Sequence, residues 1–170
     1  PYDILGQLCA YATQRDIGIW VWKASEVSLN LELTRGSGKN KFQALQAVHV
    51  PLNVREMRTE VKRIAEAGAK GIKLDYIQSE SSRWKTYMED FLKVCAEYRL
   101  MVDFHGCPTP AGESRTYPNE LTREAIYGGE KLRGGGGAKK KPTAQYIDLL
   151  FTRLSAGHAD YTPAIFSHPQ

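Results

Sequence analysis

Cysteines, long apolar runs and targeting segments are scarce in this sequence. Its 170 residues include three cysteines, Cys9, Cys95 and Cys107, whose spacing matches no metal-binding pattern. An odd number cannot be paired completely within one chain, so no disulfide framework is predicted, and Cys9 and Cys95 fit small core residues on helices. No apolar run approaches the ~20 residues that a membrane-spanning helix needs. No signal peptide is recognisable, which leaves the compartment open.

Charge of one sign is also scarce outside a single tract. The net charge of +4 comes largely from residues 131–141, and no basic helix face or interleaved aromatic series accompanies that tract. Nucleic-acid binding is therefore not predicted. Hydrophobic residues make up 42% and charged residues 25%, a composition that supports an ordinary hydrophobic core.

What the sequence does contain is a helix, a short loop and a strand, three times over. A helix-like run passes into an apolar strand within residues 8–22, 53–76 and 91–105. This alternation predicts an α/β fold with parallel strands and right-handed crossover helices. A complete (β/α)8 barrel needs ~250 residues, so we expect a partial barrel that is a piece of a longer, multidomain protein.

The middle of the chain has the firmest local signals. Asn53 can cap a helix of apolar period and Gly68 can end it. A strand over 71–76, a helix over about 82–98 and a strand over 100–105 follow. A turn-rich loop then leads to a short predicted helix, residues 120–126, and an apolar run from Ile147 to Leu154 turns at Gly157. Residues 25–51 are hard to place; the loop 36–41 lacks the second half of a phosphate-binding motif.

Two predicted strands end on polar residues that belong at one rim. Asp75 and His105 are one crossover unit apart, the separation of neighbouring parallel strands. Lys73 shares the face of Asp75, and a lysine at a barrel mouth needs a partner. A helix cap or surface ion pair remains an alternative for Asp75. His105 can be a ligand, a donor to substrate or a core histidine.

Aromatic and further acidic residues leave alternatives open. Trp20 and Trp22 share one strand face, as members of a packed barrel layer or as an aromatic platform for a sugar. Glu124 and Glu130 lie near the predicted helix at 120–126, as part of a solvated face or as partners of Asp75. Two carboxylates of this kind are what glycoside hydrolysis uses, one to attack or activate water and one to protonate the leaving oxygen.

Five motifs together resemble the catalytic barrel of glycoside hydrolase family 97. They are residues 68–75 (GAKGIKLD), 102–106 (VDFHG), 115–119 (RTYPN), 121–124 (LTRE) and 151–163 (FTRLSAGHADYTP). They occur in the family's order, within a match from about Ile17 to Phe166. The resemblance implies the middle of a (β/α)8 barrel, without the N-terminal β-sandwich and C-terminal β domain that family members carry.

The resemblance also implies roles for individual residues. Glu130 is similar to the family's general acid, and Glu124 with Glu130 to its calcium ligands. Inverting members carry a glutamate base after the strand-end histidine, whereas retaining members carry glycine there and use the aspartate that ends the Gly-Ile-Lys strand. Gly106 and Asp75 therefore resemble the retaining, α-galactosidase branch. Lys73, His105 and Trp22 are similar to residues that bind the sugar.

The expected function is thus hydrolysis of terminal α-galactosides with retention, assisted by Ca²⁺. An α-glucosidase of the same family, a carbohydrate-binding piece without turnover and a purely structural piece of barrel remain alternatives. For a retaining pair, the carboxyl groups of Asp75 and Glu130 are expected ~5–5.5 Å apart. Linkage, oligomeric state and compartment stay open, with a periplasmic or extracellular place implied if the protein follows the bacterial family.

Overall fold

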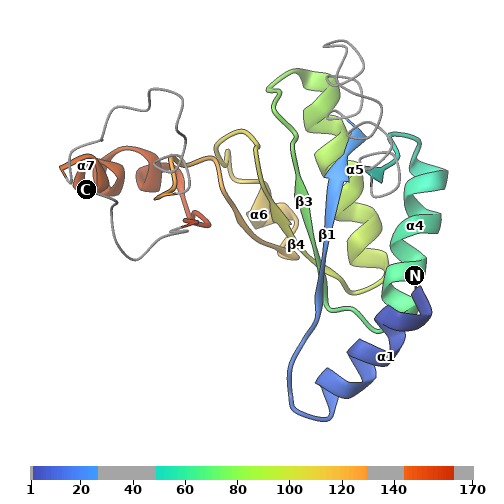
Figure 1. The fold of residues 1–170 in the computed structure, drawn as a ribbon. Helices are drawn as coiled ribbons and strands as arrows, with labels where there is room; N and C mark the ends of the chain where they lie inside the picture. Colours follow the sequence, from blue (N-terminus) through green and yellow to red (C-terminus); the bar gives the residue numbers. More distant parts are fainter. Residues whose placement is uncertain (1, 27–48, 130–143, 163–170) are drawn as a thin grey trace, which may run out of the picture.

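The computed structural model describes residues 2–26, 49–129 and 144–162, which form one parallel sheet with helices (Figure 1). Its elements in chain order are α1 (Tyr2–Thr13), β1 (Trp20–Ser25), β2 (His49–Val50), α4 (Val54–Glu66), β3 (Gly71–Asp75), α5 (Ser82–Glu97), β4 (Met101–Phe104), α6 (Glu113–Thr116), β5 (Glu120–Arg123), α7 (Ala144–Phe151) and the short 3₁₀ helix η2 (Arg153–Ala156).

All pairings in the sheet are parallel, as predicted. The strand order is β2-β1-β3-β4-β5, so β1, β3, β4 and β5 are neighbours in chain order. Trp22 lies opposite Lys73, and Lys73 opposite Asp103. The register between β4 and β5 shifts between Val102 and Asp103. Such an irregularity bends and twists a strand locally.

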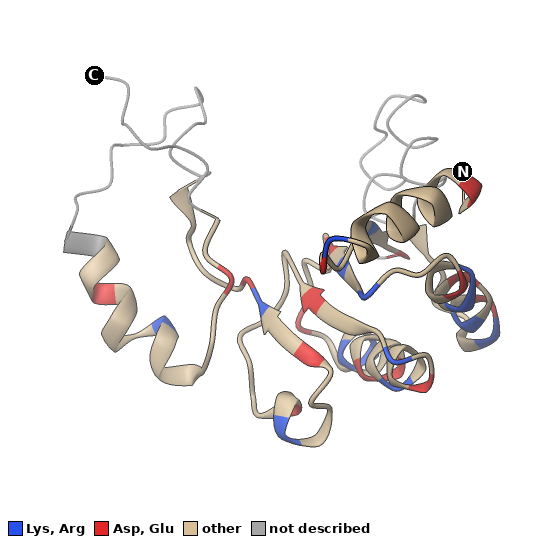
Figure 2. Cartoon of the chain, turned by 90° about the horizontal axis from the view of Figure 1, so that it is seen from below, with Lys and Arg blue, Asp and Glu red and all other residues tan. Residues whose placement is uncertain are grey.

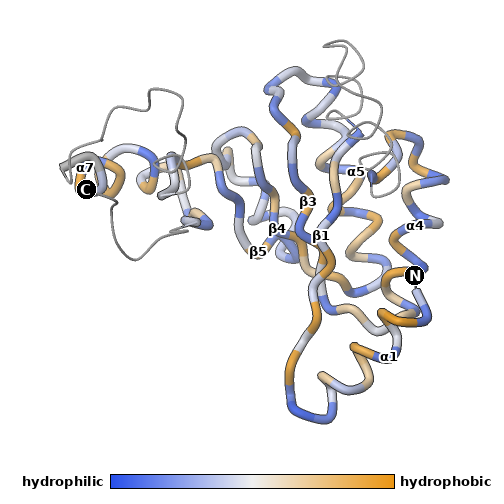
Figure 3. The backbone as a smooth tube through the Cα atoms, in the orientation of Figure 1, coloured by the Kyte–Doolittle hydropathy of each residue, from blue (hydrophilic) through white to orange (hydrophobic). Residues whose placement is uncertain are grey.

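The hydrophobic core lies between the sheet and two helices. Figure 2 looks nearly along α4 and α5 and shows them as one layer on one side of the strands. Their fully buried residues include Met57, Ile64 and Phe91, which pack with Leu74 and Phe104 of the sheet. Hydrophobic and hydrophilic residues alternate along both helices (Figure 3), as expected when one face covers a core. Cys9 and Cys95 are buried, as predicted.

A buried polar contact joins β1 to the helices on the same side. Lys23 is 7% exposed, and its ammonium pairs with Glu60 of α4, which also accepts a hydrogen bond from the Tyr2 hydroxyl of α1. A lysine on the core side of a strand requires such partners, because an unpaired buried charge is costly. The contact anchors α1 beside α4.

The limits of α4 confirm the sequence prediction. The Asn53 side-chain oxygen accepts from the backbone N–H groups of Arg55 (2.9 Å) and Glu56 (3.2 Å), which are otherwise unpaired at a helix start. Gly68 follows the last turn with φ +94°, a left-handed conformation that glycine adopts without strain. The two ends of α4 are therefore fixed by local residues, and Gly68 sets the direction in which the chain enters β3.

The prediction of a helix over residues 120–126 is wrong. Residues Glu120–Arg123 form β5, which pairs in parallel with β4, and the nearby helical turn is α6. Glu120 and Arg123 are 3% and 1% exposed, so both charged residues belong to the interior. The ion pair between Glu120 and Arg123 allows a strand with charged residues at both ends to be buried. Because β5 ends at Arg123, Glu124 directly follows a strand and does not lie beside a helix.

Several sequence predictions fall outside the described residues. These concern the loop 36–41, most of the segment 25–51, the glycine-rich tract 134–137 and Glu130. The apolar run that begins at Ile147 includes the second half of α7, and the chain turns at Gly157 after η2. Within the described ranges, no helix combines the length and apolar character needed to cross a membrane.

Candidate functional site

The candidate site lies at the carboxyl ends of β3, β4 and β5, on the sheet face away from the helices. Strand side chains alternate between faces. In β3 the residues Ile72 and Leu74 point into the core, so Lys73 and Asp75 occupy the other face and are only half buried. Active sites of barrels built from parallel strands lie at this end. The prediction that Asp75 and His105 share one rim is confirmed.

Asp75 is held by two donors. Its Oδ2 accepts a hydrogen bond from Trp22 Nε1 (3.1 Å) and its Oδ1 accepts one from the Tyr76 N–H (2.7 Å). Tyr76 has φ +64°, and its ring meets that of Trp22 edge to face with centroids 5.8 Å apart. Both carboxylate oxygens are therefore oriented by the protein, and the Asp75 carboxyl group is presented at the strand end in a fixed position.

The two tryptophans of β1 differ in their surroundings. Trp20 covers Gly71, where a Cβ atom would lie 2.5 Å from the indole, so the close approach of the two strands depends on that glycine. Trp22 is 41% exposed. An exposed indole beside a carboxylate is the arrangement that an aromatic platform for a sugar requires, and it stands next to Asp75.

Gly106 connects the end of β4 to both neighbouring strands. Its carbonyl accepts from the Gln78 N–H (2.5 Å), and its own N–H donates to Glu124 Oε2 (2.8 Å). Its φ is +53°, and a Cβ atom there would lie 3.3 Å from the Tyr76 backbone and 3.6 Å from Asp75 Oδ1. A side chain at position 106 would be strained and would press on the Tyr76 backbone, and its Cβ atom would touch the Asp75 carboxylate at ordinary contact distance.

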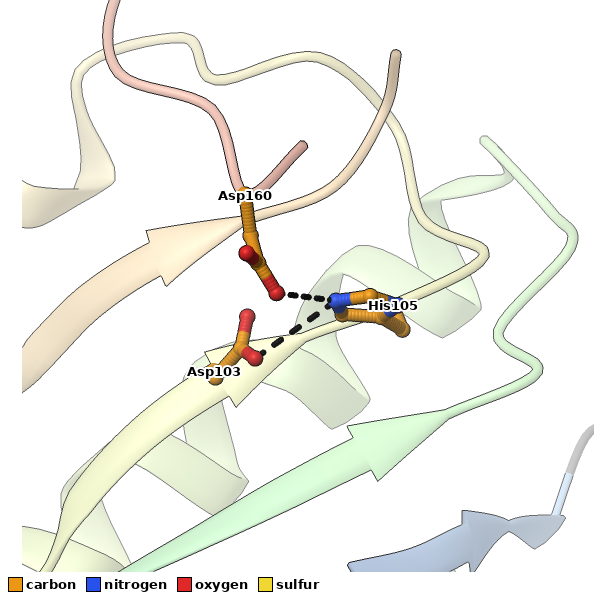
Figure 4. A group of neighbouring side chains, drawn as sticks. All are labelled: Asp103, His105 and Asp160. Atoms are coloured by element: carbon orange, nitrogen blue, oxygen red, sulfur yellow. Dashed lines mark hydrogen bonds and ion pairs between the residues drawn. The ribbon is translucent and has the colours of Figure 1, made fainter. Parts of the chain in front are cut away.

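A cluster of charged side chains surrounds His105, which is 5% exposed (Figure 4). Its Nε2 lies 2.6 Å from Asp160 Oδ2 and 3.5 Å from Asp103 Oδ2, and its Nδ1 lies 3.7 Å from Glu124 Oε2. Lys73 Nζ lies 3.9 Å from Asp160 Oδ2. Lys73 thus has the partner that its inward position required.

The two aspartates of this cluster respond to it in opposite ways. Burial raises the pKa of Asp103 to about 7; the His105 ring opposes the increase and the Asp160 carboxylate adds to it. Its Oδ1 is buried without a hydrogen-bond partner among the described residues. Burial also acts on Asp160, but hydrogen bonding from His105 outweighs it and lowers the pKa of Asp160.

The raised pKa of Asp103 predicts a pH-dependent loss of stability. Between pH 4 and pH 7, Asp103 keeps its proton in the folded protein but releases it in the unfolded chain. The free energy of unfolding therefore falls as pH rises through this range. Asp103→Asn cannot lose this proton. When pH is raised from 5 to 8, we therefore expect its free energy of unfolding to increase by about 1–2 kcal/mol relative to that of the wild type, after allowance for solvent screening.

Urea unfolding of both proteins at the two pH values measures this gain. The matched control is Asp148→Asn at an exposed position of α7, which should follow the wild type at both values. Parallel pH profiles for Asp103→Asn and wild type would contradict the prediction.

The structure brings Trp22, Lys73, Asp75, His105 and Glu124 to one rim, whereas Glu130 lies outside the described residues. Sequence reasoning assigned no role to Asp160 or Asp103. The signal for Asp160 was Lys73, an inward lysine in need of an acid, but nothing in the sequence indicated which acid.

Two sets of residues can be considered for a cation. Asp103, His105 and Asp160 offer donor atoms within 4.8 Å of one another. Glu124 is 8% exposed, and the Gly106 N–H holds one of its oxygens. A carboxylate oriented by such a bond keeps lone pairs for a hard cation, so Glu124 could contribute one oxygen ligand.

Comparison with known proteins identifies the family. The sequence pattern of glycoside hydrolase 97 matches residues 2–126. A probable retaining alpha-galactosidase of Streptomyces bingchenggensis is 31% identical over 166 residues, which cover 96% of this chain and 21% of the relative. A retaining alpha-galactosidase of Bacteroides thetaiotaomicron is 27% identical over 158 residues, with coverages of 93% and 20%. The chain thus spans about a fifth of the length of these relatives.

Solved structures agree. A family 97 enzyme of Pseudoalteromonas sp. strain K8 in complex with panose aligns with this chain at a TM-score of 0.67 and 20% identity. The alignment covers 96% of this chain and 24% of the enzyme chain. A beta-arabinopyranosidase has a TM-score of 0.56 at 26% identity, with coverages of 75% and 19%. The parallel sheet and its helices therefore correspond to part of a family 97 catalytic domain, and the chain belongs to glycoside hydrolase family 97.

Proposed function

We propose that the protein that carries this chain hydrolyses terminal α-galactosides with retention of configuration, with Asp75 as the nucleophile. The observation that carries the proposal is the Asp75 carboxylate, oriented by Trp22 and Tyr76 at the end of β3 and bordered by Gly106. The names of two relatives, a probable retaining alpha-galactosidase and a retaining alpha-galactosidase, support the same chemistry.

Gly106 supports the retaining route of glycoside hydrolysis. An inverting enzyme needs a carboxylate base that activates water, and the glycine at position 106 provides none. Asp75 would instead attack the anomeric carbon while Glu130 protonates the leaving oxygen. The resulting ester between Asp75 and the sugar would then be hydrolysed by water, which Glu130 deprotonates as it returns to its starting state.

Three residues at the rim would bind the sugar. Lys73 presents an ammonium group on the same strand face as Asp75, two residues before it. Trp22 offers an exposed indole beside the nucleophile, and sugar rings pack well on such surfaces. His105 has little exposed surface, so its contact with substrate would be limited to the edge of its ring.

Calcium is part of the proposal through Glu124 and Glu130. Glu124 supplies a buried carboxylate whose orientation Gly106 fixes. A bound calcium ion would supply positive charge near the sugar hydroxyls. The Gly106 N–H holds one oxygen of Glu124 through a bond within the protein, so this carboxylate would need little reorientation to bind the ion.

Specificity for α-glucosides is a second candidate. Structures of the Pseudoalteromonas family 97 enzyme contain panose and acarbose, and both align with this chain at TM-scores of 0.67 and 0.63. At 19–20% identity these structures establish the fold and leave sugar preference open. A comparison of aryl α-galactoside and aryl α-glucoside as substrates decides between the two.

The test follows the product sugar by proton NMR, with and without a calcium chelator. We expect the α-galactoside to be cleaved faster than the α-glucoside and the α anomer to appear first, before mutarotation. Chelation should lower the rate and added Ca²⁺ should restore it. The β anomer as first product would exclude retention. Failure to cleave either glycoside, with sugar still bound, would indicate a carbohydrate-binding protein without turnover.

A further inference from the structure

We propose that Asp160 is a positioning residue that holds His105 and Lys73 in place for the substrate. Its Oδ2 lies 2.6 Å from His105 Nε2 and 3.9 Å from Lys73 Nζ. One carboxylate thus contacts groups from β3 and β4 at the same rim. The inference rests on the proposed function, because Lys73 and His105 are the residues assigned there to sugar binding.

Asp160 is itself fixed by the end of β5. Its backbone N–H donates to the Arg123 carbonyl (2.9 Å). The buried guanidinium of Arg153 donates to the carbonyls of Ala125 (2.6 Å), Glu124 (3.0 Å), Gly157 (3.2 Å) and His158 (3.1 Å). These bonds tie the segment that precedes Asp160 to the turn that carries Glu124. The carboxylate therefore reaches the rim from a rigid support.

The contact sets the orientation of the His105 ring. A bond from Nε2–H to a carboxylate selects the tautomer and the ring plane, as carboxylates do for catalytic and metal-binding histidines. Asp103 also faces Nε2, but at 3.5 Å it lies beyond good hydrogen-bond distance. The opposite nitrogen, Nδ1, then faces Glu124 at 3.7 Å. Asp160 thus links the sugar-binding residues to the proposed calcium ligand.

The short distance also argues against a shared metal ion in this cluster. Nitrogen and oxygen ligands at ~2.0–2.1 Å from a tetrahedral ion lie ~3.3 Å apart. His105 Nε2 and Asp160 Oδ2 are closer than that, at the distance of a charge-assisted hydrogen bond. A direct bond accounts for the pair without an ion between them.

The test compares Asp160→Ala and Asp160→Asn with the exposed control Asp148→Ala in the protein that carries this chain. For Asp160→Ala we expect a 10–100-fold weaker binding of galactose by calorimetry. For an aryl α-galactoside we expect a similar rise in KM with a smaller change in kcat. Asp160→Asn, which keeps an acceptor oxygen for His105, should lose less. Added formate should restore part of the loss in Asp160→Ala only, because it replaces the missing carboxylate.

The outcomes separate this inference from the proposed function. If the wild type cleaves no glycoside but Asp160→Ala loses galactose binding and formate restores it, the proposed activity fails and the positioning role stands. Wild-type binding and KM in Asp160→Ala would overturn the positioning role. So would a loss that formate does not reverse and that accompanies a lower melting temperature than the control, since Asp160 would then support only the fold.

Discussion

Replacement of Asp75 by asparagine is expected to lower the turnover of an aryl α-galactoside by about 10⁴-fold or more, the range seen when a nucleophile is removed from an enzyme. The amide preserves the shape of the side chain, and its single oxygen can still accept one of the two hydrogen bonds from Trp22 and Tyr76; its NH2 group only donates. The loss would therefore report nucleophilicity and not folding. Initial rates under saturating substrate measure it.

Azide makes the same prediction more specific. In Asp75→Ala the removed side chain leaves space beside Trp22, so a small anion can attack the anomeric carbon from the face that Asp75 used. We expect azide to restore turnover and to yield a galactosyl azide of β configuration, because a single displacement inverts the α linkage.

The control for both variants is Asp90→Asn on α5, whose carboxylate pairs with Lys93 on the helix layer. It should retain wild-type activity, since a surface ion pair contributes little. Unchanged turnover in Asp75→Asn, or failure of azide to rescue Asp75→Ala although both variants fold, would exclude Asp75 as the nucleophile.

The parts of the fold that the sequence predicted are those with local causes. Asn53, Gly68 and the apolar period between them determine α4 within a few residues. The run 71–75 is apolar enough to be a buried strand. Because it ends on Asp75, the sequence predicted that this carboxylate lies at the rim of the sheet. In each case a short segment carries its own signal, so no distant contact was needed to recognise it.

The features that sequence reasoning missed depend on distant contacts. Glu120 and Arg123 look like residues of an exposed helix until they are paired inside β5. Asp160 is 55 residues from His105 along the chain, and the bonds of Arg153 to Gly157 and of the Asp160 N–H to the Arg123 carbonyl help to hold the two together. Lys73 indicated that an acid was missing, but the topology alone determines which one.

The buried pair in β5 should have the largest effect on stability. Arg123 Nε and the Glu120 carboxylate are 2.5 Å apart, a second bond from Arg123 measures 2.8 Å, and the two side chains are 1% and 0% exposed. Arg123→Met would leave Glu120 buried without this cation, at a cost of about 3–5 kcal/mol in the free energy of unfolding. Urea denaturation of the two proteins measures the difference.

A double-mutant cycle separates two quantities: the contribution of the ion pair to the free energy of unfolding, and the cost of leaving Glu120 charged and buried without its partner. Arg123→Met combined with Glu120→Leu removes both charges, and hydrophobic replacement of a buried pair is often neutral. We expect the double variant to recover most of the stability that Arg123→Met loses. Strictly additive losses would contradict this, because they would show that Glu120 is solvated or paired elsewhere.

The same cycle connects stability to the site. The Arg123 carbonyl accepts from Asp160 N–H, and the Glu124 N–H donates to the Phe104 carbonyl (2.7 Å), so the backbone of β5 positions residues on both sides of His105. Arg123→Met should therefore reduce galactoside turnover as well as stability, and the double variant should restore both. Recovery of stability without recovery of turnover would mean that the Arg123 side chain positions the rim in addition to neutralising Glu120.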